Sequence, residues 1–371
     1  MKQNILVLVA GGSGGHIIPA LQLGKHWKES NNPGIVFFIG QDGTLDQKIL
    51  KNKDFLHHTQ FVKLGKFSLQ KFWFLPLLFW QLIVILVKSY SLFKKNTPTK
   101  IITTGGLLAI PVCLAGWLQK IPIELHELNV IPGKAIQFLA SVAHKIFIVF
   151  TKTATYFSTK NQQKCTVQTY PVRFEKKHIS VHKENLIRYI NQLISGSLKF
   201  DISRKTLFIL GGSQGSLLLN DLSKKFVINH TTVNQSIQII HQTGNNNTGW
   251  EQFYAKHNIP AFTFNFYKNI EHCYLLADLV LCRAGAGTLF ELLFFEKKSI
   301  VIPLVASTTD HQIENARAMQ AQFPGLFSII EQKEVQEEQE LVFKALEQQI
   351  SAPNDSTLTK NPHFTKPPHL L

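Results

Sequence analysis

The sequence NILVLVAGGSGGH at residues 4–16 joins an apolar run to a cluster of glycines, and a related sequence, TLFILGGSQG, follows at residues 206–215. Each begins with the aliphatic run typical of a buried strand and passes through GGSxG into a helical pattern. Glycines at a strand-to-helix turn let backbone N–H groups approach an anion, which the helix N-terminus also attracts. The repeat predicts two related halves, each a parallel sheet with its own glycine loop.

Short β-branched or aliphatic runs alternate with longer helical patterns along most of the chain, which favours parallel sheets with crossover helices. The expected strands are 4–10, 35–39, 101–104, 121–125 and 145–150 in the first half, and 206–210, 236–241, 262–266, 278–281 and 299–302 in the second. We therefore predict an α/β fold of two Rossmann-like domains. The predicted boundaries are an N-terminal domain at 1–170, a linker at 171–204 with a helical middle at 184–194, a C-terminal domain at 205–350 and a flexible tail at 351–371.

The composition agrees with a folded chain of two domains. Its 371 residues are 44% hydrophobic and 17% charged. Lys and Arg exceed Asp and Glu by 39 to 24, and the net charge of +15 favours an anionic partner. Four cysteines without a CxxC pair indicate a reduced, cytosolic chain without structural zinc. The apolar run after Lys2 is too short for a signal peptide and is explained better as the first strand.

A second apolar stretch, Phe72–Val87, contains only one polar residue, Gln81. It is shorter than the roughly 20 residues that a membrane-spanning helix needs, and Pro76 interrupts its first turns. No Asp or Glu occurs from Phe55 to Ile123, whereas eight lysines do. Apolar bulk ringed by lysines predicts a surface that docks on an anionic membrane, and a buried core helix with solvated lysines is the alternative.

Polar residues follow several expected strands, at the edge where parallel sheets place ligand-facing groups. His16 ends the first glycine loop; histidine suits a general base at neutral pH, and a helix cap or a phosphate ligand fits the spacing equally well. His126-Glu127 follows another strand, where a zinc site of the HExxH type would need histidine at Val130, and these two can also be plain loop residues. Gly105-Gly106 forms a third turn at the same edge.

In the second half, CRAGAGT at 282–288 leads from a strand into a helix that carries Glu291. A carboxylate there can accept hydrogen bonds from a ribose diol, or it can simply complement the helix dipole. Asp310 opens a later polar helix, where it can be no more than an N-cap. Neither glycine loop fits GxGxxG or GK[ST], which disfavours dinucleotide and P-loop sites. No DxD pair is present, so a diphosphate would need a cation from the chain, and Arg173 is the candidate.

In this order, the motifs resemble those of the MurG family, bacterial N-acetylglucosaminyltransferases that convert lipid I into lipid II. The likeness runs from Ile5 to about Ala318 and rests on GGSGGH at 11–16, GG at 105–106, HExN at 126–129, PVR at 171–173, GGSQG at 211–215, HQTG at 241–244, AGAGTLFE at 284–291 and DHQIENA at 310–316. The resemblance implies a GT-B fold, in which two Rossmann-like domains face each other across a cleft. It places the acceptor on the N-terminal domain and UDP-N-acetylglucosamine mainly on the C-terminal one.

The resemblance also implies a role for individual residues. Backbone groups of Tyr267 would bind uracil, Glu291 would hold the ribose, and Gln312, with His311 or Asn315 beside it, would bind the sugar hydroxyls. The other donor-site residues implied are Ser13, Gly14, Gly15, Asn129 and Arg173 from the first half, and Ser213, Ala286, Gly287, Thr288, Leu289 and Phe290 from the second. Gly105, Gly106, His126 and Glu127 are implied on the acceptor side. Our hypothesis is an inverting transfer, without metal or other cofactor, in which His16 is the base for the C4 hydroxyl of the muramyl sugar.

Three departures from the family pattern bear on the acceptor side. Leu107 stands where the family usually has Tyr, Leu128 where it has Gln, and Thr169-Tyr170 where it commonly has Gly-Asn. The expected partners are UDP-N-acetylglucosamine, the lipid-linked muramyl-pentapeptide and, through Phe72–Val87 and its lysines, the cytoplasmic face of the bacterial membrane, with no nucleic acid. Two alternatives stay open. One is a UDP-N-acetylglucosamine 2-epimerase, which would not need the lysine-ringed stretch; the other is a non-catalytic binding subunit, which Leu107 and Leu128 favour.

Overall fold

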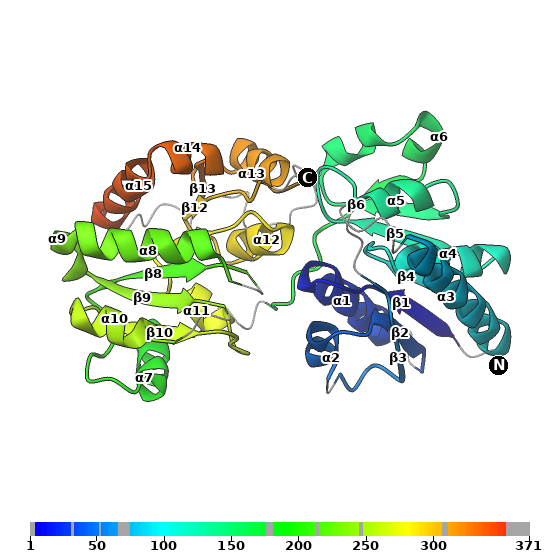
Figure 1. Ribbon diagram of the computed structural model, residues 1–371, viewed down its shortest axis with the longest axis horizontal. Helices are drawn as coiled ribbons and strands as arrows, with labels where there is room; N and C mark the ends of the chain where they lie inside the picture. Colours follow the sequence, from blue (N-terminus) through cyan, green and yellow to red (C-terminus); the bar gives the residue numbers. More distant parts are fainter. Residues whose placement is uncertain are drawn as a thin grey trace. The chain divides into compact units, whose positions relative to one another are not determined.

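The computed structural model describes residues 4–30, 33–51, 53–65, 75–175, 181–212, 215–244, 248–305 and 311–353. The chain divides into two compact units, with the division between Arg173 and Phe174. Each unit contains one parallel sheet flanked by helices (Figure 1). The predicted α/β fold with two parallel sheets is confirmed.

The first sheet has seven parallel strands in the order β3-β2-β1-β4-β5-β6-β7. They are β1 (Ile5–Val9), β2 (Ile35–Gln41), β3 (His58–Val62), β4 (Lys100–Thr103), β5 (Ile123–Glu127), β6 (Lys145–Ile148) and β7 (Cys165–Val167). The central strand β1 is buried throughout, as its unbroken apolar sequence predicts. No strand is predicted at β3 or β7, because these edge strands, HTQFV and CTV, are partly exposed and lack an apolar run.

The helices of the first unit cover both faces of this sheet. They are α1 (Gly14–Ser30), α2 (Thr44–Leu50), α3 (Leu75–Asn96), α4 (Ala109–Leu118), α5 (Lys134–Leu139), the 3-10 helix η2 (Thr151–Tyr156) and α6 (Thr159–Gln162). Successive side chains of β1 point to opposite faces of the sheet, as they do in any β-strand. Val7 and Val9 join the core cluster that α3, α4 and α5 cover, and Leu6 and Leu8 join the cluster under α1 and α2.

The second sheet repeats this plan with six parallel strands in the order β10-β9-β8-β11-β12-β13. They are β8 (Lys205–Leu210), β9 (Ile237–Gln242), β10 (Ala261–Phe264), β11 (Leu279–Cys282), β12 (Ser299–Val301) and β13 (Phe327–Ile329). Its helices are α7 (Lys183–Leu193), α8 (Leu217–Asn229), α9 (Thr231–Asn234), α10 (Trp250–Lys256), α11 (Glu271–Leu276), α12 (Ala286–Phe294), α13 (His311–Gln322), α14 (Gln332–Glu337) and α15 (Glu340–Ser351). The strand order reverses between β8 and β11, as it does between β1 and β4 in the first sheet.

The segment predicted as a linker packs largely with the second unit. The Phe174 ring is buried against Tyr274 and Phe295. Helix α7 buries Leu186, Ile187 and Ile190. From residue 174 onward this segment is therefore a structural part of the second unit. The predicted tail lies outside the described residues from 354 onward.

Helix α3 is longer than the sequence predicts. It runs for 22 residues from Leu75 to Asn96, and Pro76 lies in its first turn, where a proline is tolerated because its missing N–H would have no intrahelical partner. Pro76 therefore does not break the part of the helix that the structure describes, and Phe72–Phe74 lie outside the described residues. By length and composition alone α3 could cross a membrane. A single helix of this kind among the described residues is weak evidence for a membrane span.

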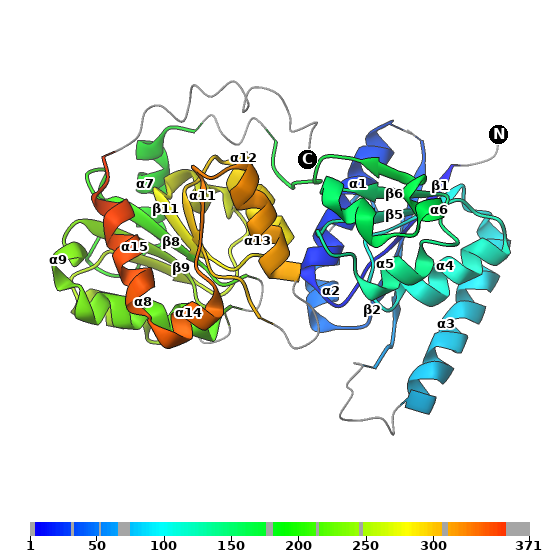
Figure 2. The same cartoon turned by 90° about the horizontal axis from the view of Figure 1, so that it is seen from above.

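One side of α3 packs against the rest of the first unit, and the other side is exposed to solvent. Ile85, Ser89 and Phe93 are buried, and the helix packs against α4. Its opposite side exposes apolar side chains, with 67% of Phe79 and 62% of Trp80 accessible. Figure 2 shows the amino end of α3 projecting from the rest of the first unit. The alternative of a buried core helix is therefore excluded. We call Leu75, Leu77, Phe79, Trp80, Ile83 and Val87 the α3 apolar face.

Candidate active site

The first glycine loop, His16 and the Gly105-Gly106 turn lie where the strand order reverses between β1 and β4. The first glycine loop follows β1 and leads into α1, while Gly105 and Gly106 follow β4. Such a reversal leaves a crevice outside the carboxyl ends of the strands, where open α/β sheets bind ligands. Gly105 and Gly106 have φ values of +102° and +90°, which residues with a side chain rarely adopt.

His16 lies in the first turn of α1 and is held by the end of β4. Its Nδ1 is 2.8 Å from the Thr104 carbonyl oxygen, and the Thr104 hydroxyl donates to the His16 carbonyl at 2.9 Å. Because a carbonyl oxygen only accepts, Nδ1 donates, and in the neutral ring Nε2 keeps its lone pair. This is the tautomer that a general base using Nε2 requires.

The first glycine loop is held by a carboxylate that the sequence does not reveal. Asp46 of α2 is 2% exposed, and its oxygens accept hydrogen bonds from the Gly12 N–H at 3.3 Å and the Gln41 N–H at 3.0 Å. A Cβ on Gly11 would lie 2.9 Å from the Gln41 nitrogen, so only glycine fits there. Burial raises the pKa of Asp46, and these hydrogen bonds oppose that shift.

Hydrogen bonds to the buried Glu127 hold the loop between β5 and α5 in place. The Glu127 carboxylate accepts hydrogen bonds from the backbone N–H groups of Leu128 and Asn129, both at 2.9 Å, and of Gly133 at 2.8 Å. The Asn129 side-chain amide donates to the same carboxylate at 3.0 Å. Burial raises the pKa of Glu127, against the effect of these bonds. Glu127 therefore fixes the position of Asn129.

His126 is also buried, and its ring stacks on Phe147 with centroids 4.7 Å apart. Its Nδ1 is 2.7 Å from the Gln168 side-chain nitrogen. Burial, and secondarily the charge of Lys100, lowers the pKa of His126 to about 3, so the ring is neutral at physiological pH. His126 and Glu127 are thus buried side chains that hold the loop after β5 in place.

The second glycine loop shares one backbone feature with the first, a positive φ at its second glycine. Gly212 and Gly12 both have φ of +80°, and a Cβ on Gly211 would lie 2.6 Å from the Ser216 nitrogen. Ser216 is the N-cap of α8, and its hydroxyl accepts from the Leu219 N–H at 3.4 Å. Ser213 lies outside the described residues.

Arg283, just after β11, ties three loops together behind the second glycine loop. Its Nε donates to the Ser216 hydroxyl at 3.1 Å, and Nη1 donates to the Ile302 carbonyl at 3.2 Å and to Gln332 Oε1 at 3.0 Å. Burial lowers the pKa of Arg283 from its very high ordinary value, which leaves the guanidinium charged. No role is predicted for Arg283 from the sequence, because its neighbours are distant in the chain.

Buried residues of the HQTG motif at 241–244 pack against the second glycine loop. His241 is buried, with Nδ1 2.9 Å from the Tyr254 hydroxyl and Nε2 3.0 Å from Asn220 Oδ1. Asn220 in turn donates to the Thr243 carbonyl at 3.1 Å. A Cβ on Gly215 would meet Thr243 O at 2.8 Å, so the loop and the HQTG turn are in close contact. Burial lowers the pKa of His241 to about 3.

Helix α12 starts at the carboxyl end of β11 with Ala286, Gly287 and Thr288 in its first turn. The N–H groups of a first turn have no intrahelical partners and are suited to an anion. Glu291, one turn later, is buried and accepts from the Tyr274 hydroxyl at 2.7 Å. The side chains of Leu289 and Phe290 lie in the core, which leaves only their backbone atoms for a contact with a donor. Gln312 accepts from the Leu304 N–H at 2.9 Å.

Tyr267 lies in the loop after β10. Its ring packs on those of Phe262 and Phe264, with centroids 5.2 and 5.5 Å away, and its hydroxyl is 3.1 Å from His272 Nδ1. The neighbouring Phe266 side chain is 76% exposed at the same edge of the sheet. No role is predicted for Phe266 from the sequence, although an aromatic residue next to the predicted nucleoside-binding Tyr267 is a signal that could have found it.

Known proteins that resemble the chain point to one family. Residues 6–148 match the glycosyltransferase family 28 N-terminal domain, and residues 206–365 match its C-terminal domain. A protein of Protochlamydia amoebophila, named UDP-N-acetylglucosamine–N-acetylmuramyl-(pentapeptide) pyrophosphoryl-undecaprenol N-acetylglucosamine transferase, is 32% identical over 348 residues, or 92% of this chain and 86% of the relative. A relative of the same name from Natranaerobius thermophilus is also 32% identical, over 85% of this chain and 83% of its own length. The chain belongs to this family, the MurG family.

Solved structures support the fold. The crystal structure of Acinetobacter baumannii MurG matches with a TM-score of 0.66 at 21% identity, over 94% of this chain and 91% of that one. The UDP-GlcNAc 2-epimerase of Neisseria meningitidis matches with a TM-score of 0.58 at 12% identity, over 87% and 92%. At these identities the matches report the fold alone. The predicted GT-B fold and the predicted membership in the MurG family are both confirmed.

The departures from the MurG family pattern lie partly inside the first unit. Leu128 is 3% exposed, and Leu107 is half-buried against the core cluster of the first unit. Tyr170 is buried as well, whereas Thr169 is exposed. The two leucines therefore replace polar residues of the MurG pattern mainly at packed positions, which weakens the argument for a non-catalytic subunit.

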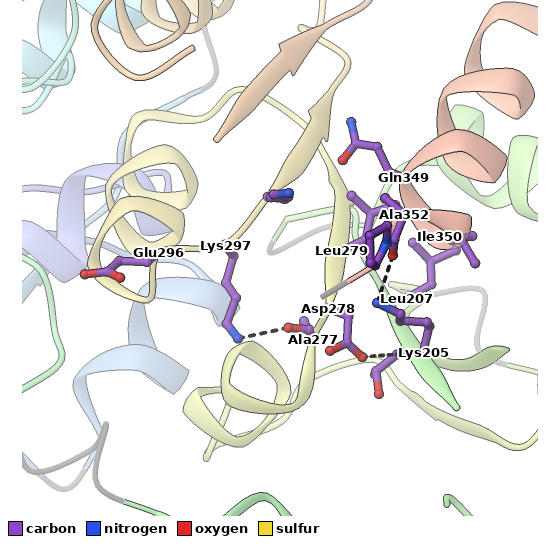
Figure 3. A pocket seen from close by; sticks show the side chains of 13 residues that line it. Lys205, Leu207, Ala277, Asp278, Leu279, Glu296, Lys297, Gln349, Ile350 and Ala352 are labelled. Atoms are coloured by element: carbon purple, nitrogen blue, oxygen red, sulfur yellow. Dashed lines mark hydrogen bonds between the residues drawn. The ribbon is translucent and has the colours of Figure 1, made fainter. Parts of the chain in front are cut away.

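A cavity of about 230 Å³ lies away from all of these residues, at the amino ends of the strands of the second sheet (Figure 3). It is lined by the starts of β8 and β11, among them Lys205 and Asp278, and by Lys297, whose ammonium donates to the Ala277 carbonyl at 2.9 Å. MurG-family motifs lie at the carboxyl ends of the strands, so this cavity is not the candidate active site. Among the described residues, no group of three or more His, Cys, Asp or Glu is placed to hold a metal ion.

Proposed function

We propose that the protein transfers N-acetylglucosamine from UDP-N-acetylglucosamine to the C4 hydroxyl of undecaprenyl-diphospho-N-acetylmuramyl-pentapeptide, with inversion. The donor and the lipid-linked acceptor are those that the relatives' names describe. The observation that carries the proposal is the pair of glycine loops: one leads into His16, and the other precedes a helix N-terminus backed by Arg283. We assign the acceptor to the first unit and the UDP-sugar mainly to the second.

In the proposed reaction, His16 Nε2 accepts the proton of the acceptor hydroxyl. The hydroxyl oxygen forms a bond to the anomeric carbon while the bond from that carbon to the UDP oxygen breaks, so UDP leaves with the bonding electrons. The first-turn N–H groups of α12 and the positive charge of Arg283 favour the charge that develops on the diphosphate. Arg173 and the residues Ser13–Gly15 complete the donor site from the first unit.

The nucleoside is assigned to the carboxyl edge of the second sheet. Glu291 binds the ribose, and the backbone at Tyr267 binds uracil. The exposed Phe266 ring offers a flat apolar surface on which a base can stack. Gln312 is assigned to the sugar hydroxyls. Each of these groups belongs to the second unit, which agrees with a donor bound mainly there.

The decisive experiment measures UDP release from UDP-N-acetylglucosamine in detergent with a chelator present. Release that requires a lipid-linked muramyl-pentapeptide analogue would support the transferase and its independence of metal. Release without the acceptor, together with formation of the C2 epimer of the sugar, would instead identify an epimerase. Donor binding with no turnover under any of these conditions would identify a binding subunit.

We further propose that the α3 apolar face docks the protein on the cytoplasmic face of the membrane. Lys88 lies exposed next to Val87 on α3, and Lys94 and Lys95 lie exposed in the last turn of that helix. Lys120 lies exposed just after α4, which packs against α3. Apolar side chains that enter the interface and cations that meet anionic headgroups act together in such binding.

Vesicle binding tests this second assignment. The double variant F79E/W80E should bind vesicles of anionic phospholipid at least about 100-fold more weakly, because each buried aromatic side chain contributes about 1.5–3 kcal/mol and about 1.4 kcal/mol is tenfold. Leu217→Glu, at an exposed apolar position of the second unit, is the matched control and should bind like the unchanged protein. Equal binding by F79E/W80E would exclude the α3 apolar face as the docking surface.

A further inference from the structure

We propose that α7 is a support for the nucleoside-binding loop and that Tyr189 is its positioning residue. The proposal rests on the proposed function in one respect, namely that the loop at 265–267 binds the base of UDP. It gives a role to the helical segment that the MurG resemblance leaves without one.

The contacts form a chain from α7 to the loop. The Tyr189 ring meets the His272 ring edge-on, with centroids 5.2 Å apart. His272 lies in the first turn of α11, and its Nδ1 is 3.1 Å from the Tyr267 hydroxyl. Burial above all, with smaller effects from Cys273 and the Tyr189 hydroxyl, raises the pKa of Tyr267. Tyr189 therefore acts on the loop through His272.

Helix α7 is itself fixed to the second unit at two places. Lys183 at its start donates to Asp278 Oδ1 at 3.0 Å, and Asp278 Oδ2 accepts from the Thr206 N–H at 2.7 Å. Its buried residues Leu186, Ile187 and Ile190 hold the helix along its length. The helix is thus tied to β8 and β11, the two central strands of the sheet, and provides Tyr189 with a rigid base.

The loop needs such support because its own elements are small. Helix α11 has six residues, fewer than two turns, and β10 is the edge strand of the sheet. The exposed Phe266 contributes no packing that would hold the loop. Ordering one side chain at a binding site opposes binding by about 0.5–1.5 kcal/mol, so a loop already held in place binds more tightly.

Direct binding of UDP, measured by calorimetry on the full chain, tests the proposal. Tyr189→Ala should raise the Kd for UDP by about 2- to 10-fold, because the loop must then be ordered on binding. It should also reduce the preference for UDP over CDP, since a more mobile loop discriminates less between uracil and cytosine. Tyr189→Phe, which keeps the ring contact with His272, should restore most of the affinity. At saturating donor, kcat should stay unchanged.

The control is Leu193→Ala, an exposed position at the end of the same helix. It should leave both Kd and base preference as they are. If the unchanged protein binds no UDP, the proposed function fails. If it binds UDP and Tyr189→Ala binds UDP and CDP with the same affinities as the unchanged protein, the role of α7 is refuted while the proposed function stands. An equal loss in Tyr189→Ala and Leu193→Ala would mean general damage to α7 and would also refute it.

Discussion

The first and second glycine loops share the pattern GGSxG, yet side chains of opposite charge hold them in place. Gly12 and Gly212 share φ of +80°. The Asp46 carboxylate accepts from the first loop, whereas the Arg283 guanidinium donates to Ser216, which begins the helix after the second. A carboxylate beside a loop repels a diphosphate, and a guanidinium attracts one. The second loop is therefore the better diphosphate site, and the first is better suited to an uncharged sugar and to the base His16.

This difference predicts that His16 serves the chemical step and not donor binding. His16→Ala should lower kcat by about 10²–10⁴-fold, the usual contribution of general base catalysis, and leave the Kd for UDP nearly unchanged. Steady-state kinetics and calorimetry measure the two quantities. His26→Ala, at an exposed position of the same helix, is the control. Full activity of His16→Ala would remove His16 from the role of base.

On the second loop, Arg283→Met should weaken binding of UDP by about 10- to 100-fold. The change removes the positive charge beside the proposed diphosphate site, and one charged partner contributes about 1.5–3 kcal/mol, which is roughly 10- to 100-fold. Gln332→Ala removes one of the Arg283 acceptors but keeps the cation, so its effect should be much smaller. If Gln332→Ala weakens UDP binding as much as Arg283→Met, the hydrogen bonds of Arg283 matter and its charge does not. If neither variant is weakened, Arg283 has no part in UDP binding, and either result would contradict the contrast between the loops.

The two units should behave alike in acid, because each has one buried neutral histidine. Burial lowers the pKa of both His126 and His241 to about 3, below the ordinary value of about 6.5. The unfolded chain then binds the extra proton first, so stability is full above pH 6.5 and falls as the pH drops toward 3, by about 1.4 kcal/mol per pH unit for each histidine.

Urea unfolding between pH 7 and 4.5 measures this loss. His126→Gln and His241→Gln should each flatten the pH dependence, since glutamine does not titrate. A slope that neither substitution changes would mean that other groups dominate acid unfolding and that the two histidines are protonated without penalty.

The smallest effect is expected at Asp46. Asp46→Asn places an amide donor against the N–H donors of Gly12 and Gln41, which displaces the first glycine loop. We expect kcat to fall by about 10-fold, within the range that a small misplacement of a catalytic group produces, with the Kd for UDP unchanged. Asp42→Asn, nearby and exposed, is the control. A change in Kd without a change in kcat would show that Asp46 serves the donor after all.

The fold class, the internal repeat and most of the central strands follow from the sequence alone, because an unbroken apolar run and a glycine turn are local signals. ILVLV before GGSGGH and TLFIL before GGSQG suffice to predict two buried strands with similar loops. The family follows from the order of the motifs for the same reason, since each motif is contiguous. His16, Glu291 and the first turn of α12 are reached in this way.

Only the tertiary structure decides which groups hold those loops. Asp46 meets Gly12 across 34 residues, and Arg283 meets Ser216 across 67, so neither pairing leaves a pattern in the sequence. The short edge strands β3, β7 and β13 lack the apolar periodicity that burial on both faces imposes. The contact of Tyr189 with His272 likewise depends on the packing of α7 against α11. Local sequence determines which element forms, because propensity and burial act residue by residue, whereas side chains distant in the chain become neighbours only through folding.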